Sequence, residues 1–195
     1  MYTIEKETIY EQIIKKSVFI TQLFPVESID EINEILRVVR KTHYEATHNC
    51  YAYIIGDNGE YFKASDDGEP SQTAGVVIYE VLKKNNLTNV LCIVTRYYGG
   101  IKLGAGGLIR AYGSSATGVL KEAIITEIIP EVNILIVTDY QHVDMVINAM
   151  NQYTIIDKTF LEKINLKYTI PEADFQEIES HLINITKNNI KIEAL

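Results

Sequence analysis

The alternation of apolar and polar positions predicts strands and helices along the whole chain. Runs of β-branched and aromatic residues favour strands in the N-terminal part at residues 8–14, 17–24, 49–55, 61–65 and 90–95. Apolar residues at helical spacing favour helices there at residues 29–39, 73–85 and 108–123. The first helix follows a capping box that begins at Ser28, and Asn58-Gly59 is typical of the turn in a β-hairpin.

The C-terminal part has a regular pattern. Residues 163–170 alternate strictly between apolar and polar positions, which is typical of an antiparallel strand with one buried and one solvated face. Around this strand the sequence predicts strands at 131–139, 154–160 and 189–194, and helices at 141–151 and after Pro171. The resulting order, β-α-β-β-α-β, is that of a ferredoxin-like fold.

The distribution of glycine divides the chain in two. All 11 glycines lie between Gly56 and Gly118, and residues 119–195 contain none. Because Pro130 stands near this change, we place a domain boundary near residues 127–131. The expected fold class is α+β, with an N-terminal α/β domain over residues 1–128 and a ferredoxin-like domain over residues 131–195.

The composition is that of an ordinary globular protein. Hydrophobic residues make up 47% of the chain and charged residues 23%, which excludes a disordered or low-complexity chain. No apolar run approaches the ~18 residues that a membrane span needs, and the first residues do not resemble a signal peptide. We therefore expect a cytoplasmic protein that does not contact a membrane, with Cys50 and Cys92 as reduced thiols of the core.

The chain is acidic but contains one basic stretch. Its 18 lysines and arginines against 26 acidic residues give a net charge of −8. Between Glu80 and Glu122 there are six cations and no acidic residue, a local charge of +6. The total charge argues against a non-specific nucleic-acid binder, whereas the basic stretch favours contact with an anion.

The strongest functional signal is a glycine-rich segment over residues 95–112. Backbone N–H groups freed by glycine and the start of the next helix favour a phosphate, cations attract it, and tyrosines can stack on bases. The candidate phosphate-binding or nucleic-acid-binding residues are Arg96, Tyr97, Tyr98, Gly99, Gly100, Lys102, Gly104, Gly106, Gly107 and Arg110. The segment is neither a P-loop, which needs lysine in place of Ala105, nor a dinucleotide fingerprint, which needs glycine in place of Ile109. A tight turn with close backbone packing is the alternative without a ligand.

An acidic loop before the predicted helix at 73–85 is the second candidate. Its residues of interest are Asp66, Asp67, Glu69, Ser71 and Thr73. The carboxylates could hold Mg²⁺, but a turn followed by a helix that Ser71 or Thr73 caps is the simpler interpretation. A third possibility is that the carboxylates pair with the basic segment. Since no motif of a nucleophile or a metal set is present, we expect no catalytic residue, no metal and no cofactor.

The glycine-rich segment resembles the signature of the YigZ/IMPACT family. The acidic loop also agrees with this family, as do Lys16-Ser17-x-Phe19-Ile20 and His48-Asn49-Cys50-Tyr51-Ala52-Tyr53. The resemblance implies an N-terminal domain similar to the second domain of a small-subunit ribosomal protein, and a C-terminal domain similar to the last domain of elongation factor G. This sequence departs from the family at Gln72, where glycine is usual.

The resemblance also implies a role in translation, because eukaryotic relatives regulate translation through protein contacts. Our first hypothesis is a non-enzymatic, translation-associated protein that binds RNA or the ribosome through the basic glycine-rich segment. The second is a Mg²⁺-dependent enzyme or binder of a small phosphorylated ligand, clamped by Lys102 and Arg110. The third is an adaptor for a protein of the translation machinery, using the C-terminal domain, whose five lysines and ten acidic residues give a charge of −5.

Overall fold

The computed structural model describes residues 1–195, which form two compact units, Met1–Ile128 and Ile129–Leu195. The first unit is built on a five-stranded antiparallel sheet with the strand order β2-β3-β6-β4-β5. The strands are β2 (Thr8–Ile14), β3 (Ser17–Pro25), β4 (His48–Ile55), β5 (Tyr61–Ser65) and β6 (Val90–Tyr97). The apolar strand β6 is central, as its sequence predicts, because it pairs with both β3 and β4.

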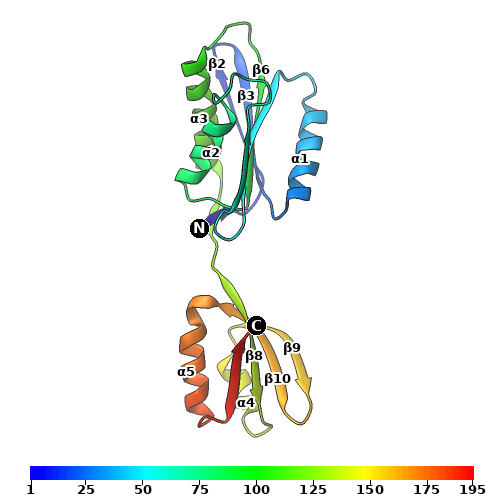
Figure 1. Cartoon of the computed structure of the whole chain (residues 1–195), viewed down its shortest axis with the longest axis vertical. Coiled ribbons are helices and arrows are strands. Elements are labelled where there is room, and N and C mark those ends of the chain that lie inside the picture. Colours follow the sequence, from blue (N-terminus) through cyan, green and yellow to red (C-terminus); the bar gives the residue numbers. More distant parts are fainter. The chain divides into compact units, whose positions relative to one another are not determined.

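Three helices cover the two faces of this sheet. The helix α1 (Ile29–Thr42) lies on one face, and α2 (Gly75–Lys84) and α3 (Ala105–Glu122) lie on the other (Figure 1). Alternate residues of β6 supply both cores: Cys92 packs on the α2 and α3 side, and Ile93 packs on the α1 side. The apolar residues of β6 therefore belong to one of two separate hydrophobic clusters, according to their parity.

At the start of α1, Ser28 caps the helix as predicted, but Glu31 bonds the residue before the cap and not the cap residue itself. The Ser28 Oγ accepts a hydrogen bond from the backbone N–H of Glu31 at 3.2 Å, and the Glu31 carboxylate accepts one from the N–H of Glu27 at 2.8 Å. The first bond satisfies a donor of the helix that has no partner within it, and the second fixes the residue before the cap. The apolar stripe of α1 is then buried against the sheet through Ile32, Leu36 and Val39.

A short ribbon that the sequence does not predict closes the first unit. Its strands β1 (Tyr2–Ile4) and β7 (Ile125–Glu127) pair antiparallel. The N–H of Ile128 also donates to the carbonyl of Met1 at 2.9 Å, so the two ends of this unit lie side by side. Strands of three residues are too short to show a period of two in their sequence.

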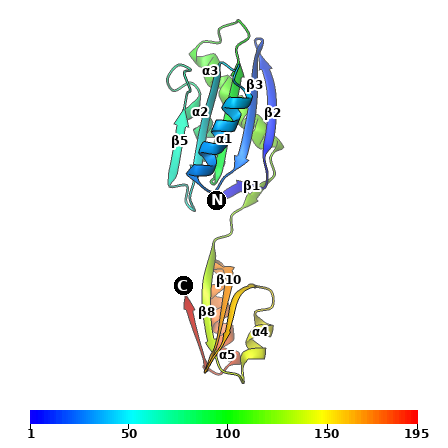
Figure 2. The same ribbon diagram turned by 90° about the vertical axis from the view of Figure 1, so that its right-hand side faces the viewer.

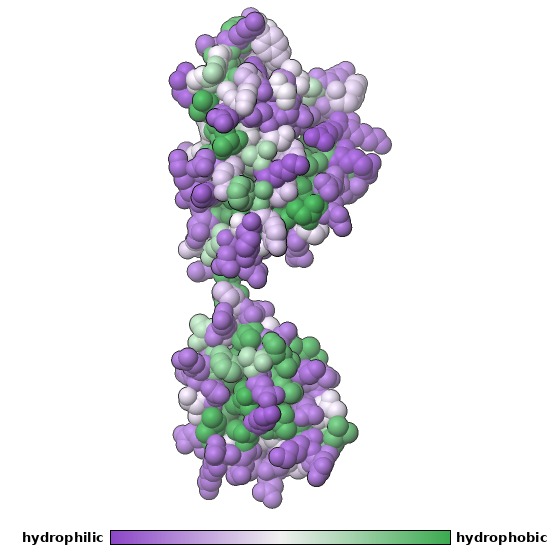
Figure 3. Space-filling model, viewed as in Figure 1, coloured by the Kyte–Doolittle hydropathy of each residue, from purple (hydrophilic) through white to green (hydrophobic).

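The second unit has the predicted β-α-β-β-α-β order. Its elements are β8 (Glu131–Thr138), α4 (Val143–Ala149), β9 (Thr154–Phe160), β10 (Ile164–Pro171), α5 (Phe175–Ile185) and β11 (Ile190–Ala194). They form an antiparallel sheet in the order β11-β8-β10-β9, and both helices pack on one apolar cluster. The predicted α+β fold class is therefore confirmed. Apolar residues interrupt the hydrophilic surface of both units in the view of Figure 3.

None of the helices combines the length and the hydrophobicity that a membrane crossing requires. Both cysteines are free thiols within the core of the first unit.

We expect these thiols to be unreactive in the native protein. Burial raises the pKa of Cys50 and of Cys92 to about 12, so almost no thiolate is present at pH 8. An aromatic disulfide reagent should release no colour from the native protein at pH 8 and two equivalents after unfolding in urea. Titration of either thiol in the folded protein within minutes would contradict the burial of that residue.

Candidate functional site

The acidic loop and the glycine-rich segment meet at one end of the first unit. Between them lies an open hollow of about 460 Å³. Its lining includes Glu69 from the acidic loop, Arg96 from β6, Tyr98 directly after this strand, and Lys102 and Gly104 from the rest of the glycine-rich segment. The two sequence candidates therefore form a single site.

A buried ion pair joins the two segments beneath this hollow. The Nη1 of Arg96 lies 2.5 Å from the Oε1 of Glu69, and the two side chains are 6% and 3% exposed. The hydroxyl of Tyr112, on α3, donates to the same carboxylate oxygen at 2.8 Å. Burial raises the pKa of Tyr112, so this hydroxyl keeps its proton and remains a donor.

The guanidinium of Arg96 also has partners on β3. Its Nη2 donates to the Oγ of Ser17 at 3.4 Å, and its carbon lies 5.4 Å from the centre of the Phe19 ring. The sequence interpretation gave Arg96 the same phosphate contact as Lys102 and Arg110. The structure places Arg96 differently, because its guanidinium is bound to Glu69 in the interior. For Glu69, the interpretation that the acidic loop pairs with the basic segment therefore describes the structure.

Asp66 stabilises the start of α2, although it lies several residues before this helix in the sequence. Its Oδ1 accepts hydrogen bonds from the backbone N–H groups of Ala74 at 3.0 Å and Gly75 at 2.8 Å, and its Oδ2 accepts one from Gln72 at 2.9 Å. The helix consequently begins at Gly75 and is capped by a residue that lies nine positions earlier. This corrects the expectation that a residue within the helix entry provides the cap.

Ser71 and Thr73, the two hydroxyl residues expected to cap the helix, do not cap it. The Oγ1 of Thr73 donates to the carbonyl of Pro70 at 2.6 Å, and Ser71 is exposed. The carboxylate of Asp67 accepts a hydrogen bond from the backbone N–H of Asn49 at 2.7 Å, so this carboxylate also binds the backbone. No group of three or more His, Cys, Asp or Glu side chains is arranged to hold a metal ion.

The departure at Gln72 has a conformational cost. This residue has a φ of +63°, in the left-handed region that glycine adopts without strain. A glycine at this position would suit the backbone better than Gln72 does. The acidic loop nevertheless keeps its hydrogen bonds to the carboxylate of Asp66.

The glycine-rich segment leaves the start of α3 open. Gly104 precedes the helix with a φ of +72° and has no side chain that could accept a hydrogen bond from the first turn. The first acceptor within the helix is the carbonyl of Gly104, which receives the N–H of Leu108 at 2.9 Å. The N–H groups of Ala105, Gly106 and Gly107 are thus free to bind an anion, and the helix dipole favours negative charge there.

Two other glycines shape the loop. Gly99 packs so closely on the backbone of Lys16 and Ser17 that a Cβ at this position would overlap those atoms. Its N–H donates to the Oγ of Ser17 at 3.1 Å. Gly100 follows with a φ of +82°, which turns the chain away from β6.

The two tyrosines at the end of β6 take different positions. The hydroxyl of Tyr97 lies 2.9 Å from the Nδ1 of His43, on the α1 side of the sheet. Tyr98 is 46% exposed and lies 5.5 Å from the guanidinium of Arg96. Of the two, Tyr98 lines the hollow and can offer a ring face to a base.

The surface near the hollow is basic. Lys102 and Arg110 are exposed and form no ion pair. Lys15 and Lys16, at the turn between β2 and β3, add positive charge next to Gly99. The sequence interpretation missed this contribution because the two lysines stand about 80 positions before the glycine-rich segment, and only the pairing of β3 with β6 brings them there.

Comparisons with known proteins identify similar chains. The family model described as the Impact N-terminal domain matches residues 15–120. A Bacillus subtilis (strain 168) protein, IMPACT family member YvyE, is 50% identical over 126 residues, which are 65% of this chain and 58% of that protein. A Haemophilus influenzae IMPACT family member is 32% identical over 200 residues, covering 100% of this chain and 97% of its own.

A solved structure has the same overall architecture. A crystal structure of a hypothetical protein superposes with a TM-score of 0.71 at 27% sequence identity, and the match covers 100% of this chain and 96% of that one. Both units are therefore present in that protein.

We expect Asp66→Ala to destabilise the first unit by about 1–3 kcal/mol, because three backbone N–H groups lose their acceptor. Urea unfolding measures this change. Asp57→Ala is the matched control, since Asp57 is exposed and its carboxylate holds no hydrogen bond; it should change stability by less than about 0.5 kcal/mol. Equal effects of the two substitutions would contradict the capping role.

Removing one member of the buried ion pair should be costly. We expect Glu69→Gln and Arg96→Met each to lower the free energy of unfolding by about 3–5 kcal/mol, because each leaves the partner buried without its counter-charge. The double variant should lose clearly less than the sum of the two. Additive losses in urea unfolding would mean that the two side chains do not depend on each other.

Proposed function

The chain belongs to the IMPACT family, and from that premise we propose that it is a translation-associated, non-enzymatic protein that binds RNA phosphates through the glycine-rich segment. The single observation that carries this proposal is the open start of α3 beside the exposed Lys102. The link to translation rests on family membership, and the binding chemistry rests on the site.

Three kinds of group there suit a nucleic acid. The free N–H groups of the first turn of α3 and the ammonium of Lys102 can bind a phosphate, and Arg110 can bind a neighbouring one. The ring of Tyr98 can stack on a base without reading its identity. These groups predict an affinity that depends little on the base sequence of the RNA.

The internal ion pair supports this use of the hollow. A free carboxylate at Glu69 would repel a phosphate, but Arg96 neutralises it from within the protein. The exposed cations around the hollow therefore determine its charge. The second unit carries a net charge of −5, which disfavours contact with a polyanion.

Metal-dependent chemistry has weaker support. Asp66 and Asp67 direct their oxygens at backbone N–H groups, and Glu69 is bound by Arg96 and Tyr112. The carboxylates of the acidic loop are thus occupied within the protein.

We expect the affinity for a labelled single-stranded RNA, measured by fluorescence anisotropy, to fall steeply between about 50 and 200 mM salt. Lys102→Ala/Arg110→Ala should weaken binding and make the plot of log affinity against log salt shallower by about 1.4, since two phosphate contacts are lost. A salt titration of binding to purified ribosomes tests whether the natural ligand is ribosomal RNA.

Lys83→Ala/Lys84→Ala is the matched control. It removes the same charge from the end of α2, away from the hollow, and should leave the slope unchanged. Equal slopes for all three proteins, or no binding by the wild type, would overturn the proposal.

A further inference from the structure

A second surface of the first unit lies on the opposite face of the sheet. Helix α1 crosses the middle of this face and leaves the edge strand β2 beside it (Figure 2). Ile9 and Ile13 of β2 are 58% and 67% exposed on this side. They stand opposite the half-buried Gln22 and Val18 of β3, and β2 and the adjoining edge of β3 form a strip that α1 covers only in part.

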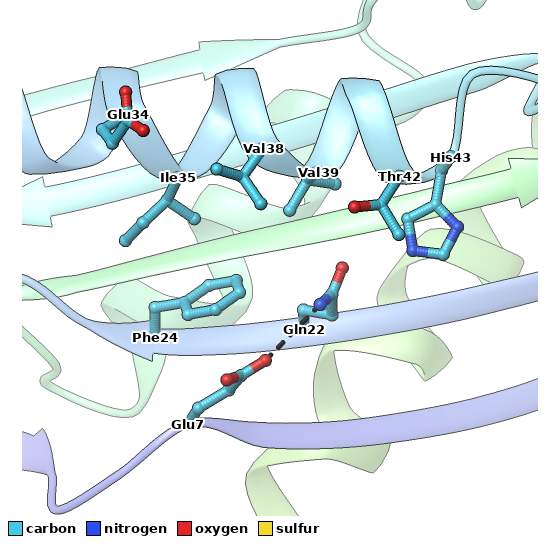
Figure 4. Close-up of a pocket in the computed structure, with 9 residues that line it drawn as sticks. All are labelled: Glu7, Gln22, Phe24, Glu34, Ile35, Val38, Val39, Thr42 and His43. Carbon is cyan, nitrogen blue, oxygen red and sulfur yellow. Dashed lines mark hydrogen bonds between the residues drawn. The ribbon is translucent and has the colours of Figure 1, made fainter.

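A groove separates α1 from this strip. It has a volume of about 240 Å³, with Ile35 and Val38 of α1 along one side and Phe24 of β3 below (Figure 4). Val38 is 47% exposed. The groove can hold an apolar side chain the size of leucine or phenylalanine, and the exposed isoleucines extend its apolar surface.

The carboxylates of Glu7 and Glu34 line the groove, and no lysine or arginine does. They lie on its β2 side and its α1 side, and Glu11 lies on β2 between the two exposed isoleucines. Glu34 pairs with Arg37 along the exposed side of α1, and such an exposed pair contributes little and can be exchanged.

We propose that this surface, formed by the α1 groove and the strip carrying Ile9 and Ile13, binds a basic amphipathic segment of a partner protein. Apolar side chains of the segment occupy the groove and cover the isoleucines. Its lysines or arginines pair with Glu7, Glu11 and Glu34. Charge complementarity favours this occupant, because Glu7 and Glu11 form no ion pair in the structure and Glu34 can exchange Arg37 for a cation of the partner.

This interaction is separate from the proposed RNA contact. It uses the α1 face of the sheet, whereas the hollow lies at the start of α3, and no residue lines both. The protein would thus join a nucleic acid to a basic protein segment. The two activities can be tested independently on the same full chain.

The probe is a fluorescent peptide of alternating leucine and lysine, with a serine–lysine peptide and a leucine–glutamate peptide as controls. Only the leucine–lysine peptide should bind. Val38→Ser/Ile9→Ser should weaken its binding about tenfold or more by removing the apolar contacts, and Glu7→Gln/Glu34→Gln should do so by removing the carboxylates. Circular dichroism and urea unfolding verify that these variants are folded.

Val76→Ser/Glu80→Gln is the matched control. It removes an exposed valine and a carboxylate from α2, on the other side of the sheet, and should leave peptide binding unchanged. All of these variants should keep the RNA affinity of the wild type, which separates this proposal from the preceding one.

Three results would overturn the proposal. The serine–lysine peptide would bind as well as the leucine–lysine peptide if attraction were only electrostatic. Equal losses in the α1-side and α2-side variants would show that the site lies elsewhere. A dimer that sedimentation detects in the wild type and that Val38→Ser/Ile9→Ser disperses would assign this surface to a second copy of the chain.

Discussion

The buried ion pair between Glu69 and Arg96 is the contact on which the organisation of the first unit depends. It links the acidic loop to the central strand β6, and its further partners, Tyr112 and Ser17, extend it to α3 and β3. Taking two charges out of water is costly, and the additional hydrogen bonds offset part of that cost. The pair thereby brings together two segments whose order along the chain would not make them neighbours.

Much of the architecture could be predicted from the sequence because its elements bury one face each. The strict alternation at 163–170 and the helical spacing after Ser28 both reflect local burial, and the structure confirms them. The start of α2 could not be predicted in this way, since Asp66 caps it through hydrogen bonds across a loop. The ribbon of β1 and β7 depends on pairing across almost the whole unit.

The sequence identified the segments of the candidate site but not the role of each residue. Arg96, Lys102 and Arg110 carry the same charge, yet one is interior and two are exposed, because the strand parity of β6 turns Arg96 toward α3. The same parity separates Tyr97 from Tyr98. Charge and residue type are properties of the sequence, whereas exposure results from the pairing of distant strands.

The β1–β7 ribbon has a consequence for how this fold can be carried by other chains. The ribbon holds the first and last residues of the first unit next to each other, at one point on its surface. The unit can be appended to, or inserted into, a different protein with both junctions made at the same spot, and no strand of the five-stranded sheet has to be rethreaded. Gene fusion or insertion of this unit therefore transfers the hollow and the α1 groove together, because residues of the same unit line both.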